Sequence, residues 1–358
     1  MSPSLPLEDE PGAAGVEDVR IRRIRPLISP ALLQSELVAD DDVNNFVQRS
    51  RRAVADVVHG RDPRLLVVVG PCSIHDGEQA LEYAGRLRKL AGELGDRLLV
   101  VMRVYFEKPR TTVGWKGYIN DPRLDDSNRV NEGLRLARKL LLEIAQMGVP
   151  AGTEFLDLLS PQYISDLISW GAIGARTTES PSHRQLASGL SCAIGFKNGT
   201  DGSVQMAADA LVASRASHAF MGVTKMGVAA VFETAGNEDC HVILRGGARG
   251  PNYQAPEIEA ACAALRKSGV VERVMVDCSH GNSQKDFARQ VSVAEDIAAQ
   301  IEGCERRILG VMIESHLREG KQALEPGKPL QHGISITDAC LGWEATEAVM
   351  RRLARAIR

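Results

Sequence analysis

The sequence has few aromatic residues, no excess of positive charge and no long apolar run. Only 4% of its 358 residues are Phe, Trp or Tyr, and the formal net charge at pH 7 is -3. A chain without a broad basic surface is not expected to bind nucleic acid or an anionic membrane. Apolar runs such as residues 65–69 are far shorter than the ~20 residues that span a bilayer. We therefore expect a globular protein with neither a nucleic-acid nor a membrane partner.

Paired cysteine motifs are also missing. The seven cysteines are dispersed, and no two of them form a CxxC pair. An odd and scattered set favours reduced thiols over a disulfide framework. The N-terminal residues lack the charged and then apolar pattern of a signal peptide. We therefore expect the protein to be cytoplasmic.

Composition divides the chain into an N-terminal segment and a larger body. Residues 1–16 are acidic and rich in Pro, Gly and Ser, and we expect them to be disordered. From Asp40 to Gly60 apolar residues recur at helical spacing. We therefore predict an arm and a helix within residues 1–60, followed by a second unit in residues 61–358. A unit of that size is usual for a barrel of alternating strands and helices.

The larger unit alternates short apolar runs with amphipathic helical segments, the clearest of which is 131–147. Eight strands separated by helices predict a parallel sheet that closes into an α/β (β/α)8 TIM barrel, with an open doubly wound sheet as the alternative. Residues 218–234 interrupt the alternation and predict an inserted β-hairpin. The eight strand-like runs are 65–69, 98–104, 150–155, 172–176, 192–197, 241–245, 274–278 and 308–313.

Ionisable or ligating side chains stand where these runs end. In a (β/α)8 barrel the carboxyl ends of the strands form one face, which active sites occupy. One subset is cationic, and burying so many like charges requires a partner of opposite charge. Since arginine matches both phosphate and carboxylate, we predict a substrate that carries these two groups. The cations are Arg103, Arg176, Lys197 and Arg245, with Lys108 and Arg110 from the segment YFEKPRTTVGWKG.

A second subset offers metal ligands. It comprises Cys72, His280 and Glu314, and Asp338 adds a fourth; such a mixed shell suits a divalent transition metal. Taken singly, a cysteine such as Cys72 is more often a buried apolar residue, and a histidine such as His280 is more often a hydrogen-bonded structural residue. Asp338 is equally an N-terminal residue of the last helix, and Glu154 a structural charge partner. No compact motif such as HExxH is present, so spacing alone does not establish the metal site.

Eight motifs, in order, resemble the type I, microbial 3-deoxy-D-arabino-heptulosonate-7-phosphate (DAHP) synthases. They are GPCSIHD, VMRVYFEKPRTTVGWKG, GAIGARTTES, GFKNGTDG, ILRGG, DCSHGNS, GVMIESH and SITDACLGWE. The resemblance runs from about Val19 to the C-terminus. It implies a homodimeric or homotetrameric barrel with an N-terminal extension. It also implies condensation of phosphoenolpyruvate with erythrose 4-phosphate, the first step of the shikimate pathway, with one divalent ion (Mn, Fe, Co or Zn).

The resemblance implies a role for each site residue. The metal ligands would be Cys72, His280, Glu314 and Asp338, of which Cys72 and His280 also count as catalytic. The phosphoenolpyruvate carboxylate would lie at Arg103, Lys108 and Lys197, and its phosphate at Arg176, Arg245 and the backbone near Ala175. Erythrose 4-phosphate would lie at Lys108, Arg110 and Thr111. Lys108 is the candidate acid for the new hydroxyl, and Glu154 is the candidate for orienting or deprotonating the attacking water.

The resemblance further implies a feedback site for an aromatic amino acid, with residues 1–60 serving regulation and oligomerisation. Gly222 stands where phenylalanine-sensitive relatives carry serine, and the smaller residue favours tyrosine over phenylalanine or tryptophan. The alternative is an arm and a hairpin that pack at a subunit interface without any effector. The site would comprise Asp18, Ile21, Pro161, Gln162, Leu186, Leu190, Ser191, Phe220 and Gly222.

Three other functions stay open at this point. A 3-deoxy-octulosonate type of synthase, which takes arabinose 5-phosphate, is disfavoured by the KPRT motif and the N-terminal arm. A paralogue of specialised metabolism, which takes an amino analogue of erythrose 4-phosphate, would use the same pocket. A non-catalytic regulatory subunit is expected to have lost ligands, whereas this chain retains every candidate.

Overall fold

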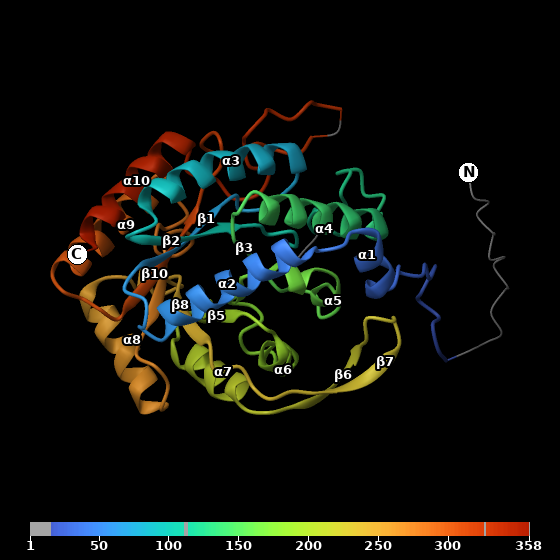
Figure 1. Ribbon diagram of the computed structural model, residues 1–358, viewed down its shortest axis with the longest axis horizontal. Coiled ribbons are helices and arrows are strands. Elements are labelled where there is room, and N and C mark those ends of the chain that lie inside the picture. Colours follow the sequence, from blue (N-terminus) through green and yellow to red (C-terminus); the bar gives the residue numbers. More distant parts are fainter. Residues whose placement is uncertain (1–15, 111–113, 326, 358) are drawn as a thin grey trace.

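In the computed structural model the eight strand-like runs form one closed barrel (Figure 1). The structure describes residues 16–110, 114–325 and 327–357. The strands are β1 (Leu65–Gly70), β2 (Leu98–Arg103), β3 (Ala151–Glu154), β4 (Trp170–Ile173), β5 (Ala193–Lys197), β8 (Cys240–Leu244), β9 (Val274–Asp277) and β10 (Ile308–Glu314). Their order around the barrel is β1-β10-β9-β8-β5-β4-β3-β2, with parallel pairing throughout. The predicted (β/α)8 barrel is confirmed, and the open sheet is wrong.

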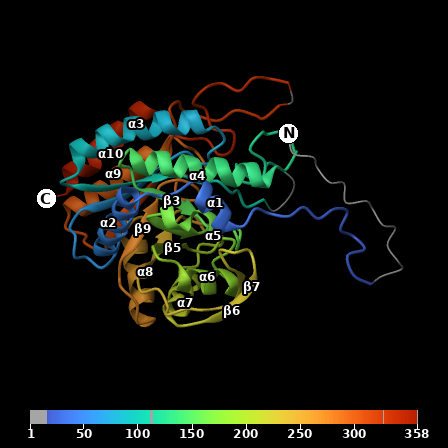
Figure 2. The same cartoon turned by 45° about the vertical axis from the view of Figure 1, so that its right-hand side comes forward.

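Helices surround the barrel (Figures 1 and 2). Before β1 come α1 (Pro30–Glu36) and α2 (Asp41–Val58). The later helices are α3 (Gly77–Leu94), α4 (Val130–Gln146), α5 (Pro161–Ile164), η1 (Ser165–Leu167), α6 (Pro181–Gly189), α7 (Gln205–Arg215), α8 (Ala255–Lys267), α9 (Arg289–Glu302) and α10 (Trp343–Ala356). Within the described ranges no helix has the length and apolar character needed to cross a bilayer.

Alternate strand residues contribute to two parts of the hydrophobic core. On β1, Leu65 packs between the barrel and its helices, whereas Leu66 fills the barrel interior. The interior cluster also contains three valines of α2, so this helix closes the amino-terminal end of the barrel. An ion pair between His59 and Asp239, just before β8, fastens the end of α2 there at 2.7 Å. Each fully buried valine contributes about 1.5–3 kcal/mol of burial free energy. The three are Val54, Val57 and Val58.

The helix predicted from Asp40 to Gly60 is α2. The Asp40 side chain caps it by accepting a hydrogen bond from the Val43 backbone amide. Gly60 adopts a φ of +74°, the left-handed conformation that ends many helices. Residues 16–24 run away from the barrel (Figure 2), and residues 1–15, expected to be disordered, lie outside the described residues. The division of the chain at residue 60 stays a prediction.

The inserted hairpin lies between α7 and β8. Its strands β6 (Ala219–Val223) and β7 (Ala229–Glu233) pair antiparallel, as the sequence predicts, and extend beyond the barrel (Figure 1). Met221 and Val231, which face each other across the hairpin, are 91% and 67% exposed.

The position of β4 differs from the predicted run at 172–176. The strand ends at Ile173 because the Gly174 carbonyl accepts hydrogen bonds from the backbone amides of Thr177 and Thr178. This turn carries Ala175 and Arg176 away from the sheet, so that both lie in a loop above the barrel rather than on a strand.

Asp338 is not part of the last helix, which begins at Trp343. The chain before this helix pairs with the end of β10, where the Leu341 amide donates to the Glu314 carbonyl. The alternative role of Asp338 as an N-terminal helix residue is therefore wrong. The same pairing brings Asp338 to the carboxyl face of the barrel.

Candidate active site

One cavity at the carboxyl ends of the strands collects most of the predicted site residues. Its volume is about 180 Å³. Glu154, Ala175, His280 and Asp338 line it, while Thr111 lies outside the described residues. All six predicted cations line it as well, and they are Arg103, Lys108, Arg110, Arg176, Lys197 and Arg245.

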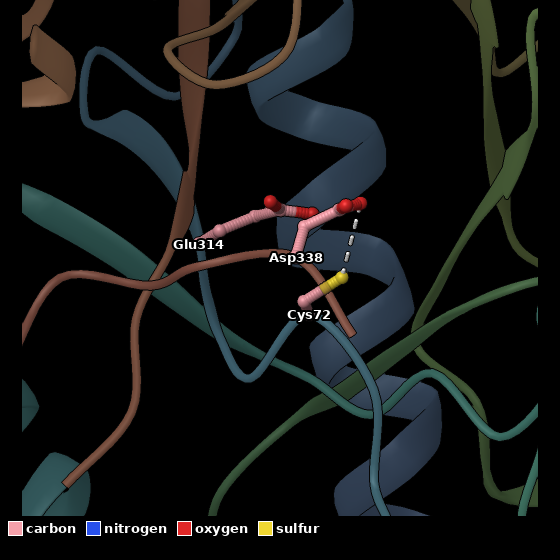
Figure 3. A group of neighbouring side chains, drawn as sticks. All are labelled: Cys72, Glu314 and Asp338. Atoms are coloured by element: carbon pink, nitrogen blue, oxygen red, sulfur yellow. Dashed lines mark hydrogen bonds between the residues drawn. The ribbon is translucent and has the colours of Figure 1, made fainter. Parts of the chain in front are cut away.

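Three candidate metal ligands meet beside this cavity (Figure 3). Cys72 follows β1, Glu314 ends β10, and Asp338 comes from the loop before α10. One ligand atom of each lies within 4.8 Å of the other two, and Cys72 Sγ is 3.6 Å from Asp338 Oδ2. His280 Nε2 lies 4.0 Å from Glu314 Oε1. The fourth candidate therefore borders the cluster that the other three form.

The surroundings of Cys72 favour its protonated thiol. Burial, with the charge of Glu314, raises the pKa of Cys72, while the Lys108 ammonium opposes this effect. Lys108 Nζ lies 3.2 Å from the sulfur and 3.1 Å from the Cys72 carbonyl oxygen. Since metals bind the thiolate, a divalent cation would displace the thiol proton. A sulfur, an imidazole and two carboxylates form a donor set that transition metals prefer, so the residues present fit such an ion.

Arg103 is bound mainly by the protein itself. It is 1% exposed, and its Nη2 donates to Glu314 Oε1 at 2.8 Å and to the Cys72 carbonyl at 3.2 Å. Its guanidinium carbon lies 3.6 Å from the centre of the Tyr105 ring. Arg103 therefore links the loop after β1 to the end of β10, and so positions two candidate metal ligands while it lines the cavity.

Arg176 and Arg245 have fewer partners than Arg103. Within the described ranges neither forms an ion pair, and each guanidinium donates to a backbone carbonyl, of Pro109 and Gly246 respectively. Burial lowers the pKa of Arg245. Two neighbouring guanidinium groups that form no ion pair among the described residues suit an oxyanion, and phosphate matches their planar forks.

Asp277, which sequence reasoning missed, is fully buried at the end of β9. Its Oδ2 lies 3.1 Å from Lys197 Nζ and 2.9 Å from His280 Nδ1, as ion-pair contacts. Burial opposes its ionisation, but the Lys197 charge and the hydrogen-bonding contacts of His280 and Ser279 hold the pKa of Asp277 well below its ordinary value. The available signal was an acidic residue at the end of an apolar run, three residues before His280.

Residues 38–351 match the sequence model of the DAHP synthetase I family. The chain belongs to this family. It is 56% identical over 342 residues to the Phe-sensitive phospho-2-dehydro-3-deoxyheptonate aldolase of Escherichia coli K12, covering 96% of this chain and 97% of that relative. It is 52% identical over 341 residues to the Trp-sensitive enzyme of the same strain, covering 95% and 98%.

Structural similarity agrees with this DAHP synthetase I assignment. The solved structure of phospho-2-dehydro-3-deoxyheptonate aldolase from Francisella tularensis SCHU S4 matches with a TM-score of 0.92 and 50% identity. The match covers 94% of this chain and 98% of that one. The resemblance to DAHP synthases, and with it the assignment as an enzyme, is confirmed.

A second and larger cavity of this DAHP synthetase I chain lies between the hairpin and the α5–α6 region. Its volume is about 1140 Å³. Asp18 and Ile21 do not line it, and both are exposed on the N-terminal arm. The other predicted effector residues all line it, and they are Pro161, Gln162, Leu186, Leu190, Ser191, Phe220 and Gly222.

Two aromatic rings shape the hairpin side of this cavity. Phe220 and Phe232 stack with their ring centres 5.9 Å apart. A Cβ atom at Gly222 would lie 2.8 Å from the Phe232 ring, so a glycine at this position avoids a steric clash with that ring. At the turn of the hairpin, Lys225 Nζ donates to the Gln162 carbonyl. Phe232 was not predicted, although its apolar side chain lies on the same hairpin face as Phe220.

Glu107 connects the two cavities. It directly precedes Lys108, and its carboxylate accepts a hydrogen bond from Ser160 Oγ at 2.8 Å. Ser160 directly precedes Pro161 of the larger cavity. Glu107 is 5% exposed, and burial raises the pKa of Glu107 to about 7. Glu107 therefore joins the segment before Pro161 to the loop that carries Lys108.

Glu107 is expected to make the protein less stable as pH rises. Its carboxyl ionises near pH 4.5 in the unfolded chain and near 7 in the folded one. The contribution of Glu107 to the free energy of unfolding is therefore intact below pH 4.5 and is lost as pH rises through 7. Glu107→Gln is expected to be more stable than wild type at pH 8, by up to about 3 kcal/mol, but not at pH 4.5.

Urea denaturation at the two pH values measures this difference in the free energy of unfolding. Glu319→Gln, which changes an exposed glutamate, is the matched control and should have little effect at either pH. A gain in stability for Glu107→Gln that is equal at pH 4.5 and pH 8 would contradict the assignment of the titrating group.

Proposed function

We propose that the protein is a 3-deoxy-7-phosphoheptulonate synthase. This transferase condenses phosphoenolpyruvate with D-erythrose 4-phosphate and water to give DAHP and phosphate, the first step of the shikimate pathway to aromatic amino acids. One observation carries the proposal. Six cations and a cluster of candidate metal ligands border one cavity in a member of the DAHP synthetase I family. The relatives named above are called phospho-2-dehydro-3-deoxyheptonate aldolases.

Phosphoenolpyruvate is proposed to place its phosphate at Arg176 and Arg245, helped by the backbone near Ala175. The absence of ion pairs from these two arginines, within the described part of the chain, supports this placement. Its carboxylate is proposed to face the cations that the protein already holds in position, and these are Arg103, Lys108 and Lys197.

Erythrose 4-phosphate is proposed to lie at the loop after β2, with its phosphate at Arg110 and Thr111 and its aldehyde near Lys108. Arg110 lines the cavity, and its Nε donates to the Trp115 carbonyl at 2.9 Å. This bond orients the guanidinium within its own loop. The isolated bridge between Glu107 and Gly117 holds the two ends of the loop together.

One divalent ion, Mn, Fe, Co or Zn, is proposed to be held by Cys72, His280, Glu314 and Asp338. When bound, such an ion supplies Lewis acidity toward the aldehyde of erythrose 4-phosphate. The sulfur and the two carboxylates support the assignment because they already lie within one ion's reach of each other.

The chain's own residues are proposed to bring two anions together and to move protons between them. The cations offset the repulsion between substrates that both carry phosphate. The methylene carbon of phosphoenolpyruvate attacks the aldehyde carbon of erythrose 4-phosphate. Water then adds to the central carbon of the phosphoenolpyruvate moiety, and the resulting hemiketal loses phosphate by C–O cleavage. Lys108 is the proposed proton donor to the new hydroxyl oxygen, and Glu154, which lines the cavity, is proposed to orient or deprotonate the water.

Loss of phosphoenolpyruvate in the presence of erythrose 4-phosphate tests the proposal. Metal-loaded protein should consume phosphoenolpyruvate when erythrose 4-phosphate is present and should release one phosphate per turnover. It should not consume phosphoenolpyruvate when arabinose 5-phosphate is the only sugar. Consumption only with arabinose 5-phosphate would favour the octulosonate type of synthase. No consumption with either sugar, in protein that contains metal, would contradict the proposal and leave an amino-sugar substrate or a non-catalytic role.

We also propose a homodimer or homotetramer in which the arm of a second copy completes the larger cavity. A volume of about 1140 Å³ exceeds the ~300–1,000 Å³ of usual small-molecule pockets. Arm residues Val19, Ile21 and Ile24 are 55–71% exposed, and an apolar arm of this kind needs a surface to cover it. In such an assembly Asp18 and Ile21 would reach the cavity from the second copy.

The occupant of that cavity is proposed to be an aromatic amino acid, with tyrosine preferred, that inhibits the enzyme by feedback. The stacked Phe220 and Phe232 offer an aromatic ring a partner, and the contact between Ser160 and Glu107 gives a path to Lys108. Two relatives are named as Phe-sensitive and Trp-sensitive. The seven cysteines are free, which supports the proposal that the enzyme works in the cytoplasm.

Gly222→Ser is expected to weaken inhibition by tyrosine by at least about tenfold and to leave the uninhibited rate unchanged. The added Cβ would lie 2.8 Å from the Phe232 ring and force that ring to move. Inhibition curves with tyrosine, phenylalanine and tryptophan measure the effect. Gly92→Ser is the matched control, because a Cβ on Gly92 of α3 would meet nothing within 4 Å. Wild-type protein that responds to phenylalanine or tryptophan but not to tyrosine would overturn the preference.

A further inference from the structure

We propose that the Asp277 carboxylate is a shared positioning group, which orients the His280 imidazole toward the metal and the Lys197 ammonium toward the phosphoenolpyruvate carboxylate. The inference rests on the proposed function and extends it to a residue that lies behind both groups. Asp277 is fully buried at the end of β9. Its two oxygens have different partners, which is the basis of the argument.

The contacts of Ser279 determine which nitrogen of His280 carries the proton. Ser279 Oγ donates to Asp277 Oδ1 at 2.6 Å and also lies 2.7 Å from His280 Nδ1. Since its only proton points to the carboxylate, the hydroxyl must accept a hydrogen bond from His280 Nδ1–H. The Nε2 lone pair of His280 is then left free, and it lies 4.0 Å from Glu314 Oε1 on the side of the metal ligands.

The backbone of His280 supports the same conclusion. Its φ is 57°, a left-handed conformation that residues other than glycine rarely adopt. Such a conformation persists only where surrounding contacts hold it in place. The His280 carbonyl accepts a hydrogen bond from the Lys285 amide at 2.8 Å, and Asp277 Oδ2, 2.9 Å from Nδ1, and the Ser279 hydroxyl contact the ring on the side opposite Nε2.

Lys197 depends on the same carboxylate. Its Nζ lies 3.1 Å from Asp277 Oδ2, and the two side chains are 4% and 0% exposed. A buried ammonium requires a counter-charge, and Asp277 is the one ion-pair partner found for Lys197 among the described residues. The lysine side chain lines the cavity. One carboxylate therefore fixes a metal ligand and a substrate-binding cation together.

Asp277→Asn should consequently weaken the binding of metal and of phosphoenolpyruvate, each measured without the other. The amide keeps the size of the side chain but removes the charge and directs N–H groups at its former partners. The affinity for metal is expected to fall about 10- to 100-fold, as for other residues behind metal ligands. The affinity of metal-free protein for phosphoenolpyruvate is expected to fall at least about tenfold.

Titration calorimetry with Mn²⁺ alone, and separately with phosphoenolpyruvate, measures the two affinities. Ser279→Ala separates the two arms of the proposal. It should weaken Mn²⁺ binding severalfold but leave phosphoenolpyruvate binding unchanged, because the Ser279 hydroxyl bonds Asp277 Oδ1 and His280 rather than the oxygen that faces Lys197. Asp166→Asn is the matched control, since it neutralises the partner of buried Arg138 outside this cavity. It should change neither affinity.

Loss of both affinities in folded Asp277→Asn protein supports the shared role, whereas loss of only one, or of neither, overturns it. If that variant does not fold, Ser279→Ala decides, and an unchanged affinity for Mn²⁺ would contradict the proposal. Wild-type protein that binds neither Mn²⁺ nor phosphoenolpyruvate would instead contradict the proposed function itself.

Discussion

Cys72→Ala is expected to lose tight metal binding and, with it, synthase activity. The Cys72 sulfur lies within 4.8 Å of ligand oxygens of Glu314 and Asp338. Residues that merely support metal ligands change metal affinity by about 10- to 100-fold, so loss of a ligand should raise the Kd for metal by more than about 100-fold. Calorimetric titration with Mn²⁺ and the metal content after gel filtration measure this effect.

Cys262→Ala is the matched control for this substitution. Cys262 is also buried, but it lies on α8 and does not line the cavity, so its variant should bind metal like wild type. A Cys72→Ala protein that still holds one equivalent of tightly bound metal would show that the sulfur is not a ligand. The mixed donor set would then have to be abandoned.

Lys108→Ala is expected to lower kcat by about 100- to 10,000-fold, the usual contribution of a proton donor at the reacting atoms. Lys108 Nζ lines the cavity and lies 3.2 Å from the Cys72 sulfur. Loss of the ammonium removes the proposed acid and one of the six cations. Steady-state kinetics at saturating metal, with each substrate varied in turn, separate the effect on kcat from the effect on KM.

Lys116→Ala provides the comparison within the same loop. The Lys116 side chain is exposed and does not line the cavity, so its removal should leave kcat near the wild-type value. Unchanged turnover in Lys108→Ala would remove this residue from the mechanism. A loss that excess metal reverses would mean that Lys108 acts only by holding the loop of Cys72.

The alternation of apolar runs with helical segments was sufficient to predict the barrel. The strands of a parallel sheet are buried on both faces, so they appear in the sequence as continuous apolar runs. Residues 65–69 and 98–102 are apolar throughout, and each segment lies within a strand. The strand predicted at 172–176 was misplaced. β4 begins with Trp170 and Gly171, and this pair does not show the apolar pattern that marks the start of a strand. The start of α10 was also missed, since the pairing of Leu341 with the end of β10 is a contact between distant segments.

The candidate site could be predicted as a set of residues but not as a set of partners. Position at a strand end identified Arg103 as an anion-binding residue, whereas the structure shows its guanidinium bonded to Glu314 and to the loop of Cys72. Asp277 was not predicted, because its carboxylate gains its role from contacts with Lys197 on another strand and with His280. The pairing of neighbouring polar side chains depends on their geometry, and the spacing of residues along a strand does not reveal this geometry.

Only some of the residues predicted for the effector site line the larger cavity. Phe220, Gly222 and Leu186 were predicted from the resemblance to DAHP synthases, and the structure brings them together within one chain, because the hairpin and the α5–α6 region border the same cavity. Asp18 and Ile21 belong to an arm that leaves the barrel (Figure 2). In the proposed assembly their place depends on a second copy of the chain, and contacts between chains leave little trace in the spacing of residues along one of them.

Reconstitution of chelator-treated protein tests the central claim most directly. The claim is that one divalent ion and the surrounding cations make a single site for the condensation of phosphoenolpyruvate with erythrose 4-phosphate. The chelated protein should consume no phosphoenolpyruvate, and Mn²⁺ added in steps should restore consumption linearly up to one equivalent per chain. Full activity that persists after removal of all metal, or recovery that requires a second equivalent, would contradict this account of the site.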